Sequence, residues 1–306
     1  MTDEKDIHAL ILTLDEAQHI GRCIDSLAGQ CASVTVIDSG SQDQTVAIAE
    51  AKGAHVVVNP FVNHASQINF GIDHLADHQG WLLRIDADEV LDGDSRQTLR
   101  DAVMSASDAV DGLLIQRRIH FLGRRIRHGA IEPSWQLRLW RIGRGRCEQR
   151  WMDEHIQVNG QVAETGVVLS DINLNSLTWW TAKHNAYASR EAVEILSQRH
   201  GLGDHQGTDG DRADTKMSPQ AQRRRFVKDK IYERLSPGVR AMAYFLYRYI
   251  LRLGILDGRA GFYFHLMQAL WYRTLVDAKV TEIELHARTH RVTIPDAIKD
   301  RVGIDI

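Results

Sequence analysis

The chain has 306 residues, of which 43% are hydrophobic and 25% are charged, proportions that are ordinary for a folded globular protein. Its formal net charge of -3 gives no argument for nucleic acid as a partner. The 3 cysteines are an odd number without CxxC spacing, which argues against a disulfide framework and against a zinc site.

Strands and helices alternate through the first half of the chain. Apolar runs of strand length are found at residues 7–14, 33–37, 54–58 and 81–85. Helices are predicted between these strands. They lie at 15–27, from the end of the segment 38–43 to about residue 52, and at 65–75. Two more strands are expected at 112–118 and 135–141. Helices between strands imply right-handed crossovers, so we predict an α/β fold with a mostly parallel sheet and helices on both faces.

The second half is expected to be helical. A long helix is predicted at 176–199, and the Gly- and Asp-rich segment 201–219 that follows has no apolar periodicity and is predicted to be a flexible loop. We therefore expect a catalytic α/β domain over 1–175 and a helical C-terminal region over 176–306.

The strand at 81–85 runs directly into a group of carboxylates. Asp86 and Asp88 alternate with Ala87, so in extended chain their side chains point to the same side. Ligands of open α/β sheets bind at the carboxyl ends of strands, and two hard oxygen donors there suit Mg²⁺ or Mn²⁺. The alternative is a solvated strand end whose acidic residues cap the next helix.

Three segments, each at the end of a predicted strand, together have the pattern of a known family. They are Leu12–Ala17, Asp38–Thr45 and Asp86–Glu89. With them, the chain resembles glycosyltransferase family 2, whose members are inverting sugar transferases with the GT-A fold. The segments Trp135–Trp140 and Trp151–His155 resemble the bacterial branch that builds lipopolysaccharide core and capsule.

The resemblance implies a nucleotide-sugar site at the first two strand ends. In the family these segments hold the base and ribose of the donor, which here assigns that role to Thr13, Leu14, Glu16, Asp38, Ser39 and Gly40. Asp38 is suited to accept a hydrogen bond from the imide N–H of uracil. The alternative for Asp38 is an aspartate that stabilises the turn.

The helix after the third strand departs from the family pattern. Where many members have an Arg that contacts the base or phosphate, this chain has Ile68. That contact is then expected from Gln67 or from Arg84, with Asn69 beside them. The alternatives are a helix N-terminal turn without a ligand, and for Arg84 an ion pair to a neighbouring carboxylate.

By resemblance, Asp86 and Ala87 face the ribose, and Asp88 binds the divalent ion, Mn²⁺ or Mg²⁺, that bridges the donor diphosphate. His155 would complete the metal shell or orient a catalytic base, although a lone His is more often structural. Gln136 and Arg138 share one face of their strand and are expected to contact diphosphate or acceptor, or else to form a salt-bridged surface.

Inverting transfer also requires a base beside the acceptor hydroxyl. Related enzymes use a carboxylate in the segment that corresponds to Trp151–His155. Asp153 is the first candidate and Glu154 the second. A buried Trp beside a carboxylate would raise its pKa by desolvation and improve it as a base. The alternative is a solvated strand start.

The last third is basic and aromatic. A cluster that begins at Arg223–Arg225 precedes the apolar, aromatic segment Ala241–Leu251, which fits a helix lying in the interface of an anionic membrane. The alternative is ordinary packing against the α/β domain. Glu282, His286 and His290 share a helical face, which we interpret as a solvated polar face rather than a metal site.

Two further observations concern location. The acidic start is unlike a secretory signal, and no apolar run approaches the roughly 20 residues that span a bilayer. We expect a cytoplasmic protein attached peripherally to the inner face of the cell membrane.

The predicted function is metal-dependent inverting transfer of a hexose, glucose from UDP-glucose, to a lipid-anchored saccharide such as lipopolysaccharide core. One alternative is transfer to a polyprenyl phosphate, which needs no base. Another is a non-catalytic nucleotide-sugar-binding protein. A nucleotidyltransferase is disfavoured because the first strand–helix turn lacks a Gly-rich phosphate loop.

Overall fold

The computed structural model describes residues 5–148, 155–202 and 238–306. The chain divides into two compact units, which are described separately below. Unit 1 comprises residues 1–127 and 131–174, and unit 2 comprises residues 128–130 and 175–306.

The first half of unit 1 is a parallel sheet in the order β3-β2-β1-β4. Its strands are β1 (Ile7–Thr13), β2 (Ser33–Asp38), β3 (His55–Val58) and β4 (Trp81–Asp86). The connecting helices are α1 (Ile20–Leu27), α2 (Thr45–Ala51) and α3 (His64–His74). All four strands match the expected apolar runs to within a residue, and the predicted α/β class is confirmed.

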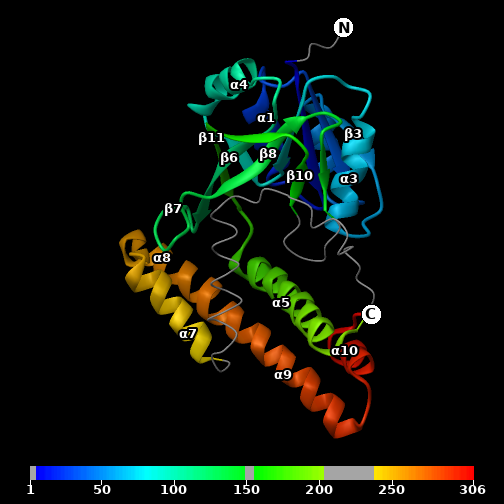
Figure 1. Ribbon diagram of the computed structural model, residues 1–306, viewed down its shortest axis with the longest axis vertical. Helices are drawn as coiled ribbons and strands as arrows, with labels where there is room; N and C mark the ends of the chain where they lie inside the picture. Colours follow the sequence, from blue (N-terminus) through cyan, green and yellow to red (C-terminus); the bar gives the residue numbers. More distant parts are fainter. Residues whose placement is uncertain (1–4, 149–154, 203–237) are drawn as a thin grey trace. The chain divides into compact units, whose positions relative to one another are not determined.

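Helices cover both faces of this sheet, as predicted (Figure 1). On one face α1, α2 and α4 (Ser95–Ser105) pack over β1 and β4 around Ile20, Leu83 and Leu99. On the other face α3 contributes Ile68 and Ile72, which pack with Leu10 and Trp140. Because both faces are buried, β1 and β4 have continuous apolar sequences rather than alternating ones.

Beyond β4 the sheet is mixed. The order continues β8-β6-β11-β5, and the β4–β8, β8–β6 and β11–β5 pairs are antiparallel whereas β6–β11 is parallel. These strands are β5 (Glu89–Leu91), β6 (Val110–Phe121), β8 (Trp135–Arg141) and β11 (Gln161–Ile172). Three short strands complete unit 1: β7 (Arg124–Ile126) pairs with β6, and β9 (Gly145–Cys147) pairs with β10 (Ile156–Val158).

The sequence did not predict β11. Its first half alternates exposed and half-buried residues and contains a register shift against β6, so it lacks the apolar run by which the other strands are recognised. Its buried second half nevertheless reaches the functional edge of the sheet, because Asp171 pairs in register with Glu89 of β5.

Unit 2 is helical. In chain order it comprises α5 (Leu177–His200), α7 (Val239–Leu246), η3 (Tyr247–Leu251), η4 (Gly254–Asp257), α8 (Gly258–His265), η5 (Leu266–Trp271), α9 (Tyr272–His290) and α10 (Ile294–Val302). Helices α5, α9 and α10 share a core that includes Leu196, Ile283 and Ile298. Glu282 and His286, on the face of α9 that was expected to be solvated and polar, pair with Arg301 and Asp300 of α10.

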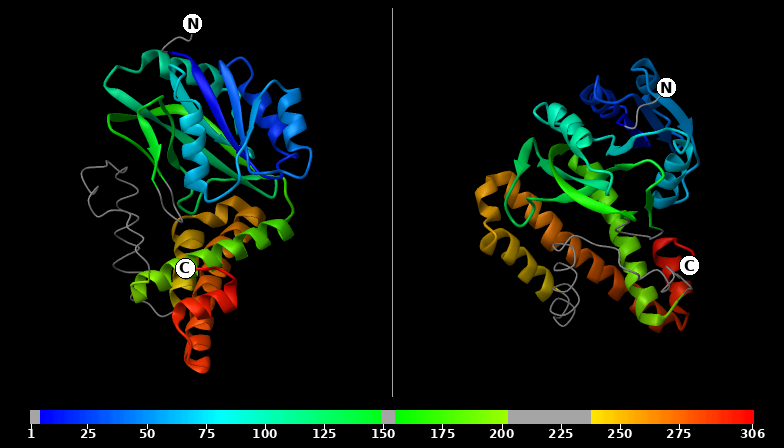
Figure 2. Two further views of the ribbon diagram at one scale, coloured as in Figure 1. Left: turned by 90° about the vertical axis from the view of Figure 1, so that its right-hand side faces the viewer. Right: turned by 45° about the horizontal axis from the view of Figure 1, so that its top comes forward.

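The segment from α7 to η5 folds back on itself as a helical hairpin, drawn in yellow to orange in Figure 2. The reversal lies between η3 and η4. There the amide of Arg252 donates to the carbonyl of Tyr247 (2.8 Å), and the amide of Leu256 donates to that of Leu253 (3.0 Å). Within the described residues, no helix combines the length and hydropathy that crossing a membrane requires.

Candidate functional site

Three parallel strands bring predicted site residues to one edge of the sheet. Thr13 pairs in register with Asp38, and the neighbouring Leu12 pairs with Asp86. The carboxyl ends of β1, β2 and β4 therefore meet, as the sequence predicted, and this is the edge where open α/β sheets bind ligands.

Asp38 is a buried, fully bonded carboxylate. Its Oδ1 accepts from the hydroxyls of Thr13 (2.8 Å) and Ser41 (2.5 Å), and its Oδ2 accepts from the amides of Gly40 (2.9 Å) and Ser41 (2.8 Å). Burial alone would raise the pKa of this carboxyl, but these hydrogen bonds outweigh burial and hold the pKa below its usual value. With about four acceptor positions occupied, Asp38 makes the contacts of the turn-stabilising alternative.

The turn that Asp38 organises leaves Ser39 and Gly40 at the surface of this edge. Gly40 has φ +96°, a conformation that a side chain would strain. The hydroxyl of Ser39 accepts from the amide of the buried Gln67 (3.0 Å), which also donates to the carbonyl of Asn59 (3.0 Å). Gln67 thus supports the turn from below.

Asn69 ties α3 to β9. Its side-chain amide donates to the carbonyl of Cys147 (2.9 Å), and its oxygen accepts from the Cys147 amide (3.0 Å). Both polar ends of this buried side chain are therefore engaged with backbone, which gives Asn69 a structural role next to the strand-end site.

The first strand end is linked to the segment that follows β11 through a buried histidine. Glu16 contacts Nδ1 of His19 (2.5 Å), and Nε2 of His19 accepts from the amide of Leu174 (2.9 Å). This pair of contacts places the proton of the neutral imidazole on Nδ1. Leu14, in contrast, is exposed.

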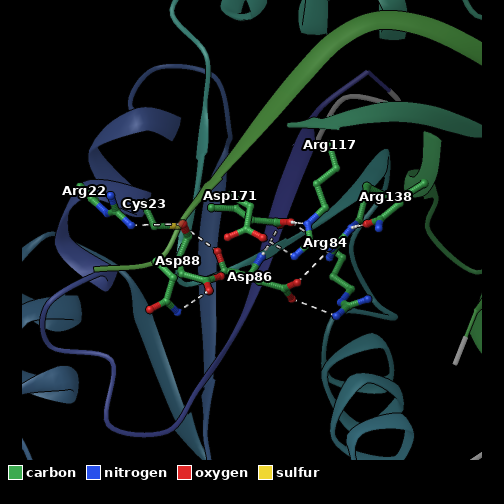
Figure 3. A network of polar contacts seen from close by, with 11 residues as sticks. Arg22, Cys23, Arg84, Asp86, Asp88, Arg117, Arg138 and Asp171 are labelled. Atoms are coloured by element: carbon green, nitrogen blue, oxygen red, sulfur yellow. Dashed lines mark hydrogen bonds and ion pairs between the residues drawn. The ribbon is translucent and has the colours of Figure 1, made fainter. Parts of the chain in front are cut away.

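Asp86 lies between two arginines (Figure 3). Its Oδ1 accepts from Arg84 and its Oδ2 from Arg138, both at 2.9 Å. Burial would raise the pKa of the Asp86 carboxyl, but Arg138 and Arg84 outweigh it, so the pKa lies well below its usual value and Asp86 stays ionised. The ion pair expected as the alternative for Arg84 is therefore present.

Glu89 anchors this arrangement from a completely buried position. One of its oxygens accepts from the Asp86 amide (3.0 Å), and the other accepts from Arg138 (3.0 Å) and lies 3.1 Å from Nε of Arg117. Burial raises the pKa of Glu89, and the two arginines only partly oppose that effect. Glu89 thereby fixes both the backbone of Asp86 and the arginine that holds its carboxylate.

The network continues to β11. Arg117 also pairs with Asp171, whose pKa burial raises to about 7 although Arg117 opposes the shift. The buried thiol of Cys23 lies behind Asp86, with Sγ 3.6 Å from the Asp86 carbonyl, and burial followed by the nearby Glu89 raises its pKa well above the usual value.

Asp88 is partly exposed and less constrained. Its Oδ2 accepts from the side-chain amide of Asn173 (3.0 Å), and within the described residues no contact involves Oδ1. Its backbone carbonyl accepts from the Ile172 amide (3.0 Å) and from Arg22 (3.2 Å). The end of β11 therefore orients Asp88 while one carboxylate oxygen is available.

The donor set at this edge suits a weakly held hard cation. Among the described residues, no group of three or more His, Cys, Asp and Glu side chains is arranged to hold a metal. Asp86 is occupied by arginines, which leaves Asp88 as the carboxylate suited to ligate. Mg²⁺ and Mn²⁺ are commonly held by one or two carboxylates together with substrate phosphates.

The remaining predicted residues are placed as follows. Arg138 is 5% exposed, and its Nε donates to the side-chain oxygen of Gln136 (2.8 Å), so both belong to the Asp86 network. Ala87 is buried. His155 is exposed, and its carbonyl accepts from the Glu148 amide (3.0 Å). Asp153 and Glu154 lie outside the described residues.

From the sequence, Glu89 was recognised only as a member of the carboxylate group, and three further residues of the network were missed: Arg117, Asp171 and Asn173. A signal existed for the last two, because Asp171 and Asn173 follow the apolar run Val167–Leu169 just as Asp86 and Asp88 follow the apolar run at 81–85. Arg117 and Glu89 could not be paired from sequence, since their contact depends on how β5, β6 and β11 assemble.

Comparison with known proteins identifies relatives of unit 1. Residues 9–160 match the model of glycosyl transferase family 2. The lipopolysaccharide core biosynthesis glycosyltransferase LpsC of Rhizobium meliloti is 32% identical over 177 residues, which covers 55% of this chain and 64% of LpsC. An uncharacterized glycosyltransferase of Rickettsia bellii is 44% identical over 87 residues, 28% of this chain and 29% of that protein.

Among solved structures, the chain is similar to glucosyl-3-phosphoglycerate synthase from Mycobacterium tuberculosis, crystallised with Mn²⁺, uridine diphosphate and glucosyl-3-phosphoglycerate. The identity is 23%, the TM-score is 0.30, and the match covers 38% of this chain and 44% of that one.

Proposed function

Because this chain belongs to glycosyltransferase family 2, through residues 9–160, we propose that it transfers a hexose from a nucleoside-diphosphate sugar to a saccharide acceptor. The observation that carries the proposal is the strand-end site itself. A partly exposed carboxylate, Asp88, stands beside a rigidly held Asp86 at the edge where three parallel strands end. A diphosphate and its cation require this combination of one available carboxylate and fixed surroundings.

Asp86 and its partners act by positioning. Arg84 and Arg138 hold the carboxylate from both sides, so its oxygens would meet a donor ribose hydroxyl in one fixed orientation. Glu89 holds the Asp86 amide, which fixes the turn that presents Asp88. Preorganised groups of this kind need no rearrangement when charge develops on the leaving group.

Asp88, oriented by Asn173, would hold a divalent cation together with the donor phosphates. The ion, Mn²⁺ or Mg²⁺, would supply Lewis-acid stabilisation of the negative charge on the departing diphosphate. The exposed turn at Ser39 and Gly40 would take the base and ribose of UDP, with the Asp38 carboxylate fixing that turn from beneath.

We propose inversion at the sugar, with Asp153 as base and Glu154 as the second candidate. The support is the sequence pattern of the segment that follows β9, since both residues lie outside the described residues. A carboxylate on the face opposite the diphosphate would take the proton of the acceptor hydroxyl as that oxygen bonds to the anomeric carbon. The bond between the anomeric carbon and the diphosphate oxygen would break at the same time, so the nucleoside diphosphate leaves and the configuration is inverted.

The name of LpsC, a lipopolysaccharide core biosynthesis glycosyltransferase, supports a lipopolysaccharide core saccharide as the acceptor class. For the donor, we propose UDP-glucose as the first nucleotide sugar to test. Such an acceptor is anchored in lipid, so peripheral attachment to the cytoplasmic face of the membrane belongs to the same proposal. The basic cluster at Arg223–Arg225 that first suggested this attachment lies outside the described residues.

Substitution at Asp88 tests the proposal. Asp88→Asn keeps the hydrogen bond with Asn173 possible but removes the charge that a cation needs, so turnover and Mn²⁺-dependent UDP affinity should both fall at least tenfold with an unchanged melting temperature. Calorimetric titration of UDP with and without Mn²⁺ measures the affinity. The exposed Asp108→Asn is the matched control and should bind as wild type. Full wild-type activity in EDTA would refute a metal-dependent site.

A second substitution tests the base. Asp153→Asn should leave UDP affinity unchanged, because the residue is assigned to the acceptor side, and should lower kcat by ~10²–10⁴, the usual contribution of general-base catalysis. Glu154→Gln, measured in the same assay, is its control. If Glu154→Gln is inactive and Asp153→Asn is not, the base is Glu154. Full activity of both variants would favour the polyprenyl-phosphate alternative.

A further inference from the structure

The exposed apolar residues of this chain are concentrated in one short segment. Of the large hydrophobic residues exposed in the described part of the chain, half lie within residues 239–263. Seven of them surround the reversal of the hairpin and are called the hairpin tip: Leu246, Tyr247, Ile250, Leu251, Leu253, Ile255 and Leu256. Soluble surfaces rarely expose so many large apolar side chains together, and such patches mark interaction sites.

The backbone at the hairpin tip places a leucine where glycine is the usual residue. Leu253 has φ +60° and ψ +25°, in the left-handed region, and its side chain is 53% exposed. A non-glycine residue costs about 1 kcal/mol in that conformation, and here the side chain gains little burial in return. Leu251, two residues earlier, is 74% exposed. Packing among the described residues explains neither leucine.

The charges around the hairpin tip are of one sign. From residue 239 to 263 the exposed charged side chains are Arg252 and Arg259. The acidic residue of this range, Asp257, is 4% exposed and is held by His128. Within residues 239–263 the apolar side chains are therefore accompanied by two exposed cations and by the exposed rings of Tyr247 and Tyr263, and this range presents no exposed carboxylate.

We propose that the hairpin tip inserts into the interface between headgroups and acyl chains of an anionic lipid bilayer. Apolar side chains would enter the acyl boundary, tyrosines would lie at headgroup depth, and Arg252 and Arg259 would pair with lipid phosphates. The inference rests on the proposed function only in explaining why a lipid-anchored acceptor makes membrane contact useful. The charge pattern favours anionic lipid over a second copy of the chain. The hairpin tip of a second copy would offer no exposed acidic residue within residues 239–263 to pair with the arginines.

A concavity beside the hairpin tip fits the headgroup end of such a lipid. It has a volume of about 400 Å³ and is lined by Tyr249, Ile255, Gly258, Arg259, Phe262 and Tyr263. Aromatic walls with a single cation match a phosphate attached to an apolar chain.

The experiment is co-sedimentation of the full-length chain with vesicles made of equal parts phosphatidylglycerol and phosphatidylcholine, compared with pure phosphatidylcholine. Wild type should bind the mixed vesicles and release as salt rises, because the attraction is screened within a Debye length. Leu251→Ser and Leu253→Gly should each weaken partitioning by about tenfold, the loss expected when one leucine no longer enters the apolar layer.

Leu253→Gly separates binding from folding. Glycine accepts the left-handed backbone without strain, so the melting temperature should hold or rise while vesicle binding falls. Leu285→Ser removes an equally exposed leucine from α9 and is the matched control, which should bind as wild type. For the charges, Arg252→Ser with Arg259→Ser should weaken binding to the mixed vesicles, whereas Arg288→Ser on α9 should not.

Three results would overturn the proposal: a folded wild-type chain that stays in solution with the mixed vesicles at low salt, hairpin-tip variants that bind as wild type, or a Leu285→Ser loss equal to theirs. Analytical ultracentrifugation tests whether a second copy of the chain occupies this surface instead. If Leu251→Ser converted a dimer to a monomer, the surface would be assigned to a second copy. No nucleotide sugar enters these measurements, and Asp88→Asn should bind vesicles normally, so failure here is distinguishable from failure of the glycosyltransferase proposal.

Discussion

At the scale of single residues, the site is a chain of ion pairs in which acids and arginines alternate, so that each buried charge is compensated by its neighbours. Asp86 is held by Arg84 and Arg138, Glu89 by Arg138 and Arg117, and Asp171 by Arg117. Removing one partner of a buried pair costs about 3–5 kcal/mol because the other charge remains buried and uncompensated. The network therefore fixes geometry more than it adds stability.

The sequence revealed half of this network. Asp86 and Asp88 were identifiable because carboxylates directly after a buried strand are costly and so require a reason. Arg84 and Arg138 were named as ligand-contacting or ion-paired, and the structure places both in ion pairs with Asp86. Glu89 was included in the carboxylate segment without a role, and Asp171 was not named. Their ion pairs with Arg117 could not be predicted, because no local pattern encodes how β5, β6 and β11 pair.

The Asp171 carboxyl makes stability depend on pH. Its pKa is about 7 in the folded protein against a usual 3.8, so between these values the folded state binds the extra proton. Stability therefore falls as pH rises through this window. The free energy of unfolding of wild type, relative to Asp171→Asn, should decrease by up to ~4 kcal/mol from pH 4 to pH 7, as measured by urea unfolding.

The exposed Asp108→Asn provides the baseline for that comparison, since replacing a solvated acid should leave the pH dependence of unfolding unchanged. A constant difference between wild type and Asp171→Asn across the window would show that Asp171 is ionised throughout.

At the scale of elements, periodicity predicted most of the parallel half of the sheet but not how tightly its layers pack. Helix α3 approaches β1 at Gly71. A Cβ added there would lie 2.5 Å from Cδ1 of Leu10 and 3.2 Å from Cγ1 of Ile37. In the sequence, Gly71 reads only as a poor helix former. The structure shows why glycine is needed here: it allows α3 to approach the sheet closely at Leu10 and Ile37.

Gly71→Ala should consequently destabilise the protein by about 1–3 kcal/mol through overpacking, even though Ala is intrinsically better in a helix by about 1 kcal/mol. Thermal unfolding measures the change. Gly93→Ala, where an added Cβ meets no atom within 4 Å, is the control. Leu10→Val should relieve the clash, so the double variant should lose less than the sum of the two single changes. A neutral or stabilising Gly71→Ala would show that Leu10 repacks freely.

At the scale of the whole molecule, the fold class followed from the sequence because each helix and strand of the parallel half has its own local pattern. The mixed half did not follow, since β11 has an alternating first segment and β5, β7, β9 and β10 have only 3 residues each. In unit 2 the sequence identified an aromatic, cationic segment but not its reversal at Leu253. Sugar-nucleotide binding and membrane binding are assigned to different units, so substitutions should abolish one and spare the other.

The thiol of Cys23 gives the candidate site an internal chemical reporter. It is completely buried behind Asp86, and its raised pKa keeps it protonated, so an alkylating reagent can reach it only when this strand end opens. The rate of its modification therefore measures the equilibrium between closed and open forms of the site. A ligand that holds Asp86 and Asp88 in place would slow alkylation of Cys23 while leaving Cys31, in the connection between α1 and β2, unaffected. Occupancy of the donor site could thus be followed by mass spectrometry even before the correct sugar is known.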